Sequence, residues 1–182
     1  GLTPRERAER EAAGRPPALR LRADVGPVTV DDVLLGEFSA VVDDVVLRRN
    51  DGVPAYNLAV VVDDAAQGVD QVVRGDDLAS STPRQAHLAD LLGLPRPTWA
   101  HVPLVLGPSG QRLAKRDGAV TLPELAALGV SALDVLRILA VSLRLALPGE
   151  PVRAADLVDR FEPVLLPTVP WVLDPGSGRS VT

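Results

Sequence analysis

Lys115 is the residue of this sequence whose type and surroundings point most directly to chemistry. It is the only lysine among 19 basic residues, the rest being arginines. Arg112 and Arg116 flank it, so three cations fall within five positions of the segment 107–118, which glycines and a proline mark as a surface loop. A lysine ammonium is a compact charge on a flexible stem, suited to following a phosphate as its charge develops. The alternative is a solvated basic turn that holds one lysine by chance.

Two further single residues invite a binding role. Tyr56 is the only tyrosine and interrupts the apolar run 55–62, where we expect a strand buried on both faces. Its hydroxyl needs a ligand there or, as the alternative, a hydrogen bond to the backbone of the core. Arg74 ends the strand-like run 69–73, and ligands of open α/β sheets bind beyond the carboxyl ends of strands. Its guanidinium could clamp a carboxylate there, or form a salt bridge with a nearby aspartate.

The remaining chemistry-bearing residues indicate neither a metal site nor paired-carboxylate catalysis. The chain has no cysteine, and its two histidines, His87 and His101, lack metal-ligand spacing. We expect His87 on the polar side of a helix and His101 as a satisfied buried imidazole in a strand. Adjacent aspartates in an extended segment point in opposite directions, so the Asp-Asp pairs are not automatic catalytic pairs.

Composition narrows the class of protein further. The 182 residues are 46% hydrophobic and 24% charged, with a formal net charge of −5 and a pI near 5.0. An acidic chain is not a general polyanion binder, although a local stripe of arginines could still contact nucleic acid. No apolar run approaches the ~20 residues of a membrane span, and the charged N-terminal residues lack the apolar region of a signal peptide. We expect a cytoplasmic, monomeric protein without a membrane partner.

The elements that must position these residues alternate in type. After a polar helix over 5–13 and strands near 18–22, 28–30 and 41–47, the order strand, strand, helix, strand over 55–106 predicts the parallel sheet of an α/β fold. Its helix follows Thr82-Pro83 and ends at Gly93. Three more helices are expected near 123–128, 132–145 and 151–161, before a proline-rich tail that lies extended along the surface.

Several motifs occur together and in one order, and together they resemble the second half of the catalytic domain of bacterial glutamyl-tRNA synthetases, which are class I aminoacyl-tRNA synthetases. The likeness covers about Ala18 to Leu145. The motifs are Arg49-Asn50-Asp51-Gly52, Ala55-Tyr56-Asn57-Leu58-Ala59-Val60-Val61-Val62-Asp63-Asp64, Val72-Val73-Arg74-Gly75-Asp76-Asp77-Leu78, Thr82-Pro83-Arg84-Gln85, His101-Val102-Pro103-Leu104 and Arg112-Leu113-Ala114-Lys115-Arg116. The resemblance implies the second half of a Rossmann-like catalytic domain, followed by short helices and the extended tail.

The resemblance also implies roles for particular residues. Tyr56 and Arg74 fall where the family binds glutamate. The segment 112–116 falls on the family's Lys-Met-Ser-Lys-Ser-type loop, with Arg112 at the first lysine, Leu113 after it and Ala114 at the serine, Lys115 at the second, ATP-contacting lysine, and Arg116 last. Leu104 and Val105 fall near the end of the strand that faces adenine. ATP, expected with Mg²⁺, is thus the implied cosubstrate.

Within the family the chain looks more like the glutamyl-queuosine tRNA(Asp) synthetases, the group without an anticodon-binding domain. Its closing Phe161-Glu162-Pro163 and Pro170-Trp171-Val172-Leu173-Asp174-Pro175 resemble their C-terminus. Such enzymes transfer activated glutamate to the queuosine base of tRNA(Asp). We expect residues 1–145 to be the second half of the catalytic domain and 146–182 a short helix and tail.

The motifs of the family's first half, its ATP-binding His-x-Gly-His-type motif and its zinc-binding cysteines, are not in this sequence. We therefore expect the 182 residues alone to be inactive. The alternatives are a piece of a standard glutamyl-tRNA synthetase, charging tRNA(Glu), and a non-catalytic synthetase-like remnant.

Overall fold

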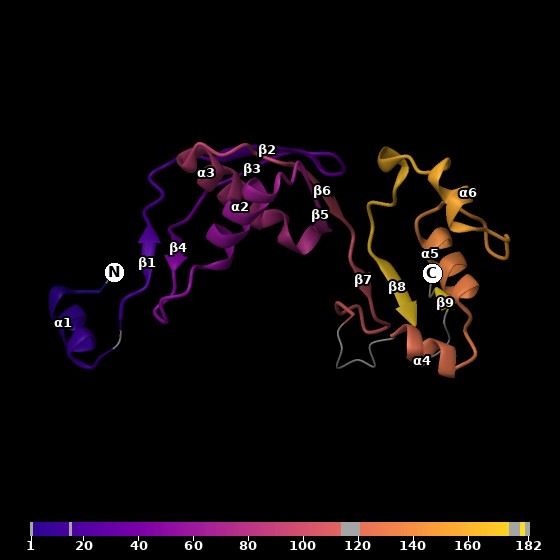
Figure 1. The fold of residues 1–182 in the computed structure, drawn as a ribbon, viewed down its shortest axis with the longest axis horizontal. Helices are drawn as coiled ribbons and strands as arrows, with labels where there is room; N and C mark the ends of the chain where they lie inside the picture. Colours follow the sequence, from indigo (N-terminus) through magenta and orange to yellow (C-terminus); the bar gives the residue numbers. More distant parts are fainter. Residues whose placement is uncertain (1, 15, 114–120, 175–178, 181–182) are drawn as a thin grey trace. The chain divides into compact units, whose positions relative to one another are not determined.

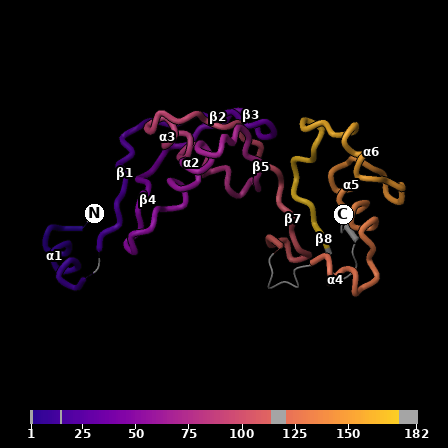
Figure 2. The backbone as a smooth tube through the Cα atoms, viewed as in Figure 1, coloured from indigo at the N-terminus to yellow at the C-terminus, as the bar shows by residue number. Residues whose placement is uncertain are grey.

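The structure is a computed structural model that describes residues 2–14, 16–113, 121–174 and 179–180. Its contacts divide the chain into two compact units (Figures 1 and 2). The first unit comprises residues 1–73 and 78–100, and the second comprises residues 74–77 and 101–182. The boundary that we expect after residue 145 stays a prediction.

The first unit begins with a polar helix and a two-stranded ribbon. Helix α1 (Pro4–Ala12) starts at a capping box, in which the Thr3 side chain accepts from the backbone of Glu6 while the Glu6 carboxylate accepts from the backbone of Thr3. No residue of α1 is buried. Strands are predicted near 18–22 and 41–47, and in the structure β1 (Leu19–Leu21) pairs antiparallel with β4 (Val45–Arg48).

A four-stranded sheet has the order β3-β2-β6-β5. Strands β2 (Val28–Asp32) and β3 (Gly36–Ala40) form an antiparallel hairpin, and β6 (Thr98–Val102) runs parallel to β2. Strand β5 (Gln71–Gly75) lies at the edge beside β6. The parallel β2–β6 pair confirms an α/β sheet. Strand β3 was not predicted, because Gly36-Glu37-Phe38-Ser39 carries too few apolar residues to show alternation.

The apolar run that begins at Ala55 is a helix, so the prediction of a strand buried on both faces is wrong. Helix α2 (Tyr56–Gln67) continues through Asp63 and Asp64 and ends at Gly68, whose φ of 71° is left-handed. No residue of α2 is fully buried. Periodicity cannot separate a strand from a helix in an unbroken apolar run. The glycine at the end and the run's real length of 12 residues decide for the helix.

Helix α3 (Thr82–Leu92) ends at Gly93 as predicted, but its beginning differs by one residue. A 3₁₀ turn, η1 (Asp76–Ser81), leads into it, and Ser81 rather than Thr82 is the N-cap. Thr82 is completely buried, so its side chain belongs to the packing of the helix. Helix α3 packs against α2 and against β2.

The core of the first unit lies between the sheet, the β1–β4 ribbon and the two helices. Its buried apolar residues come from β2, the loop before β4, β4, α3 and β6, and partly buried side chains such as Phe38, Val61 and Val72 close around them. They are Val28, Val30, Val42, Val45, Ala86, Leu88 and Trp99. The same elements therefore hold α2 and α3, which carry Tyr56 and its surroundings.

The second unit contains the predicted helices and a small sheet. Helices α4 (Leu122–Ala127) and α5 (Ala132–Ser142) lie where helices are predicted near 123–128 and 132–145, although α5 ends earlier, and each begins at a capping box, at Thr121 and Ser131. Helix α6 (Ala154–Val158) is shorter than expected. The predicted strand 99–106 is two strands, β6 and β7 (Val105–Leu106), with Pro103, which has no N–H to donate, between them.

The proline-rich tail is predicted to lie extended along the surface, but it contains a 3₁₀ turn and two paired strands. After a 3₁₀ turn, η3 (Pro163–Leu165), strand β8 (Trp171–Asp174) runs parallel to β7 and pairs antiparallel with β9 (Arg179–Ser180). The Trp171 N–H also donates to the Leu104 carbonyl at 3.1 Å. The tail thus forms a sheet with β7, the strand that contains Val105 and follows Leu104, the two residues expected near adenine. No helix in the described part of the chain is long and apolar enough to cross a membrane.

Candidate functional site

Arg74 and His101 meet at the carboxyl ends of neighbouring strands in the second unit. Arg74 lies one residue before the end of β5, and His101 lies near the end of β6. The Arg74 Nε–H donates to Nε2 of His101 at 3.0 Å. His101 is only 1% exposed, so the prediction of a buried, satisfied imidazole is confirmed. The buried imidazole therefore fixes the direction of the guanidinium.

Gly75 lies so close to two neighbouring side chains that a Cβ at this position would make them shift. A Cβ at this position would lie 2.6 Å from Oδ1 of Asp77 and 2.9 Å from Cδ2 of Leu104. Both distances are shorter than real contacts to Cβ atoms, so any larger residue would displace the Asp77 carboxylate or the Leu104 side chain. Residues 74–77 and Leu104 thus form one tightly packed surface.

An ion pair joins this surface to the base of the expected ATP-contacting loop. Nη1 of Arg112 lies 2.5 Å from Oδ2 of Asp77. The loop base is closed by backbone bonds, since the Gly107 N–H donates to the Gln111 carbonyl and the Leu113 N–H donates to the Val105 carbonyl. Leu104, Val105 and Leu113 are half-buried. Ala114, Lys115 and Arg116 lie outside the described residues.

Tyr56 occupies the first turn of α2 in the first unit. Tyr56 is 63% exposed. The alternative that it is a core tyrosine bonded to the backbone is therefore wrong. Its neighbours on both sides are anchored. The Ala55 N–H donates to the Leu47 carbonyl at 2.9 Å, and Nε2 of Gln85 donates to Oδ1 of Asn57 at 3.0 Å. An exposed phenol held by fixed backbone on either side is suited to contact a small ligand.

Gln85 and Asn57 are the residues that the sequence did not single out. Gln85 is 4% exposed and lies in α3, so its amide bond to Asn57 ties the start of α2 to the helix that packs against it. A buried amide needs such a partner. The only signal in the sequence was an amide residue placed in each of two apolar segments.

The carboxyl groups with shifted pKa values lie in other parts of the two units. The Arg84 guanidinium, bonded to Asp43, lowers the pKa of that carboxyl, and Arg96 lowers the pKa of Asp90 in the same way. Both pairs brace α3 and the segment after it. Within the described residues, no group of three or more His, Asp or Glu side chains could hold a metal ion. The second unit thus presents the guanidinium of Arg74 beside His101, and the first unit presents the exposed phenol of Tyr56.

Sequence comparison places these residues in a known group. The profile of the family described as tRNA synthetases class I (E and Q), catalytic domain, matches residues 1–150. The chain is 62% identical to the glutamyl-Q tRNA(Asp) synthetase of Nocardia farcinica, over 94% of this chain and 54% of that protein. It is 45% identical to the corresponding protein of Symbiobacterium thermophilum over 93% of this chain, and 45% identical to the glutamate–tRNA ligase of Nitrosospira multiformis over 65%.

Structural comparison agrees on the fold. A crystal structure of a glutamate tRNA ligase from Elizabethkingia meningosepticum, in complex with its amino acid, matches 97% of this chain with a TM-score of 0.75 at 22% identity. The match covers 40% of that protein, and the chain spans about half the length of the glutamyl-Q relatives named above. The expected Rossmann-like synthetase fold is confirmed. The chain therefore belongs to the catalytic-domain family of the class I tRNA synthetases (E and Q).

Proposed function

We propose that the protein activates glutamate with ATP and transfers it to the queuosine base of tRNA(Asp). The observation that carries this proposal is the extent of the likeness. The glutamyl-Q relatives from Nocardia and Symbiobacterium match over more than nine tenths of the chain, whereas the Nitrosospira glutamate–tRNA ligase matches over about two thirds. The acceptor, a tRNA, implies action in the cytoplasm, and we expect a monomer.

In the proposed reaction the residues of this chain bind and orient the reactants. A glutamate carboxylate oxygen attacks the α-phosphorus of ATP, forming glutamyl adenylate and releasing pyrophosphate. A nucleophilic group of the base then attacks the glutamyl carbonyl, and AMP leaves. Arg74, whose direction the bond to His101 fixes, would pair with a glutamate carboxylate, and the exposed Tyr56 hydroxyl would orient the same substrate.

The segment 104–116 would serve ATP. Leu104 and Val105 would contact the adenine, and Lys115 would neutralise the charge that builds on the α-phosphate and pyrophosphate. Arg112 would retain the first cation of the loop, held by Asp77. Mg²⁺ would accompany the ATP phosphates. The described residues offer no ligand cluster for it, so we assign it no step.

The acceptor is tested with the protein at the full length at which it occurs in the cell. Radiolabelled glutamate and ATP are supplied with queuosine-containing tRNA(Asp), with queuosine-free tRNA(Asp) and with tRNA(Glu). We expect label only in the first, and equally when its terminal adenosine has been removed. Charging of tRNA(Glu) that needs this adenosine would identify a standard glutamyl-tRNA synthetase. Absence of glutamate-dependent ATP–pyrophosphate exchange would identify a non-catalytic remnant. In the same assay, we expect the 182 residues alone to show no exchange.

Lys115→Ala tests the cation in the loop. We expect glutamate-dependent ATP–pyrophosphate exchange to fall at least about 10²-fold, because the ammonium would act on charge that develops in the transition state. Arg144→Ala, at an exposed position outside the site, is the matched control. Activity within a factor of two of the unsubstituted protein would remove Lys115 from the mechanism.

Arg74→Ala tests the carboxylate clamp. We expect the KM for glutamate to rise by roughly tenfold or more, with little change in the KM for ATP, because a charged hydrogen bond to one substrate is lost. His101→Ala leaves the guanidinium in place but undirected, and should raise the same KM by less. An unchanged KM for glutamate in Arg74→Ala would exclude the clamp.

A further inference from the structure

The first unit contains a cleft of about 680 Å³ with arginines on its walls. Arg7 and Arg10 come from α1, and Arg20 comes from β1. The chain between the two elements contributes Pro16, Pro17 and Ala18. We call this the arginine cleft. All three arginine side chains are exposed, so they are available to a ligand of opposite charge.

The acidic residues of α1 do not neutralise the arginine cleft. Glu6 is used by Thr3 in the capping box, and Glu9 is paired with Arg5. Glu11 is the one carboxylate that the cleft's described lining contains. Among the described residues, Arg7, Arg10 and Arg20 form no ion pair. The described lining therefore holds three cations and one anion, and two carboxylates outside it, Glu6 and Asp43, interact electrostatically with Arg10 and Arg20.

The charge around the cleft contrasts with that of the whole chain. Residues 1–22 contain six arginines and three glutamates, a net charge of +3, although the whole chain carries −5. Arg22, just past the end of β1, and Arg48, at the end of the paired strand β4, are exposed as well. Described arginines are therefore exposed both on α1 and on the β1–β4 ribbon, the elements coloured indigo and purple in Figure 1.

Packing within this chain does not account for the arginines of α1. None of its residues is buried, and its sequence, Pro-Arg-Glu-Arg-Ala-Glu-Arg-Glu-Ala, has no apolar face. A helix of this kind contributes little to a core, so its arginines are better accounted for by a partner. Guanidinium groups suit phosphate in particular, because their planar donors bind its oxygens in pairs.

We propose that the arginine cleft binds the phosphodiester backbone of the tRNA that accepts glutamate. This inference rests on the proposed function for the identity of the RNA, but it concerns residues other than those assigned to glutamate and ATP. Contacts with phosphate position an RNA without reading its sequence. The cleft would therefore increase affinity for tRNA in general, and recognition of the modified base would belong to other residues.

The test compares two double variants of the protein at its natural full length. Arg7→Gln with Arg10→Gln removes two cations of the cleft and keeps helix propensity nearly constant. Arg144→Gln with Arg153→Gln removes two exposed cations of the second unit. Filter binding measures the tRNA dissociation constant from 50 to 200 mM salt, and circular dichroism checks the fold. ATP–pyrophosphate exchange without RNA checks the active site.

We expect the cleft variant to bind tRNA roughly tenfold or more weakly at low salt. The slope of the logarithm of the binding constant against the logarithm of the salt concentration should become less steep by about 1 to 2, as expected for two lost phosphate contacts. ATP–pyrophosphate exchange should be unchanged. The control variant should match the unsubstituted protein. Inorganic phosphate should compete only as ionic strength does; competition at low millimolar concentration would mean a site for small phosphates and would overturn the proposal.

Equal tRNA binding by the cleft variant and the unsubstituted protein would overturn the inference, as would an equal loss in the control variant. These failures are distinct from failure of the proposed function. If queuosine-containing tRNA(Asp) proves not to be the acceptor, the loss of binding in the cleft variant still shows an RNA surface. If transfer occurs normally and binding is unaffected, the function stands and the cleft is excluded.

Discussion

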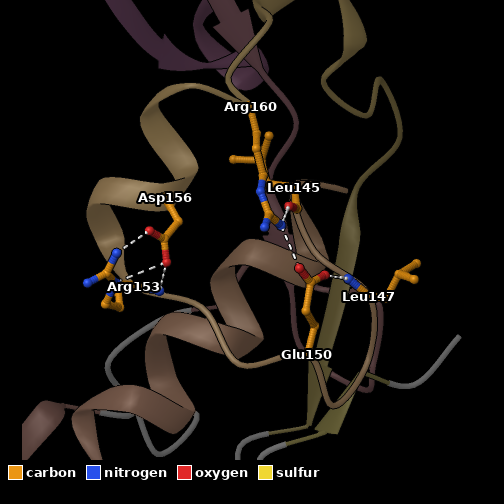
Figure 3. Close-up of polar contacts among 6 residues, drawn as sticks. All are labelled: Leu145, Leu147, Glu150, Arg153, Asp156 and Arg160. Atoms are coloured by element: carbon orange, nitrogen blue, oxygen red, sulfur yellow. Dashed lines mark hydrogen bonds and ion pairs between the residues drawn. The ribbon is translucent and has the colours of Figure 1, made fainter.

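The two units of the chain hold their elements in different ways. Nine of the fully buried apolar residues among those described lie in the first unit, and only Ala140 and Val152 lie in the second. In the second unit, ion pairs between partly exposed side chains hold segments that the small core does not bury. The segment 145–160, for example, is held by Arg160, which bonds to Glu150 and to the Leu145 carbonyl, and by the Arg153–Asp156 pair (Figure 3). Apolar burial stabilises far more than exposed ion pairs, so the units should respond differently to mutation, salt and pH.

Removing the largest buried side chain of the first unit gives the largest expected effect. Trp99 is 4% exposed, and Trp99→Ala should lower the free energy of unfolding by about 3–5 kcal/mol, from lost burial and the cavity left behind. The matched change in the second unit is Val158→Ala, at a side chain that is 72% exposed, which should cost under about 0.5 kcal/mol. Urea unfolding, combined with hydrogen exchange of peptides from each unit, measures both. A cost below about 1 kcal/mol for Trp99→Ala would contradict the contrast.

Some elements of both units could be predicted from the sequence, and others could not, for physical reasons. Helix ends were predictable wherever a local signal sets them, as at Thr3, Thr121, Ser131 and Gly93, since a cap depends on neighbouring residues only. The type of α2 was not, because an unbroken apolar run carries no period until its packing partners are known. The pairing of β8 with β7 likewise depends on residues more than 60 positions apart.

The candidate site divides in the same way. The types and order of Tyr56, Arg74 and Lys115 could be read from the sequence, and so could the buried state of His101. The contacts that hold them could not. Gln85 meets Asn57, and Asp77 meets Arg112, only because tertiary structure brings segments 28 and 35 residues apart together. Such support is invisible to any local pattern.

The buried amide bond near Tyr56 offers a middle-sized test of the first unit. Gln85→Met keeps the length of the side chain but leaves Oδ1 of Asn57 without this donor, which should cost about 1–3 kcal/mol. If Tyr56 binds glutamate, the KM for glutamate should also rise severalfold, because the start of α2 is no longer tied to α3. Urea unfolding and ATP–pyrophosphate exchange measure the two effects.

Two comparisons make that result specific. Gln67→Met alters an exposed glutamine at the end of the same helix and should change neither the stability nor the KM. In a double-mutant cycle with Asn57→Ala, a coupling of about 1 kcal/mol is expected between residues in direct contact. Purely additive effects would show that Gln85 acts through other neighbours.

The smallest expected effect belongs to the exposed pair of the second unit. The Leu147 N–H and then the Arg160 guanidinium lower the pKa of Glu150, because both favour the carboxylate. A group whose pKa is lower in the folded state adds stability above its unfolded value, near 4.3, and loses it as the pH falls through the folded value. Glu150→Gln should therefore lower the urea midpoint slightly at pH 7, and the difference should vanish as the pH falls through the folded pKa of Glu150. High salt should weaken it at pH 7.

Glu162→Gln, whose side chain makes no ion pair in the described part of the chain, should show no such pH dependence. If Glu150→Gln matched Trp99→Ala in cost, charged contacts would be holding the second unit as firmly as the core holds the first, and the distinction between the units would fail.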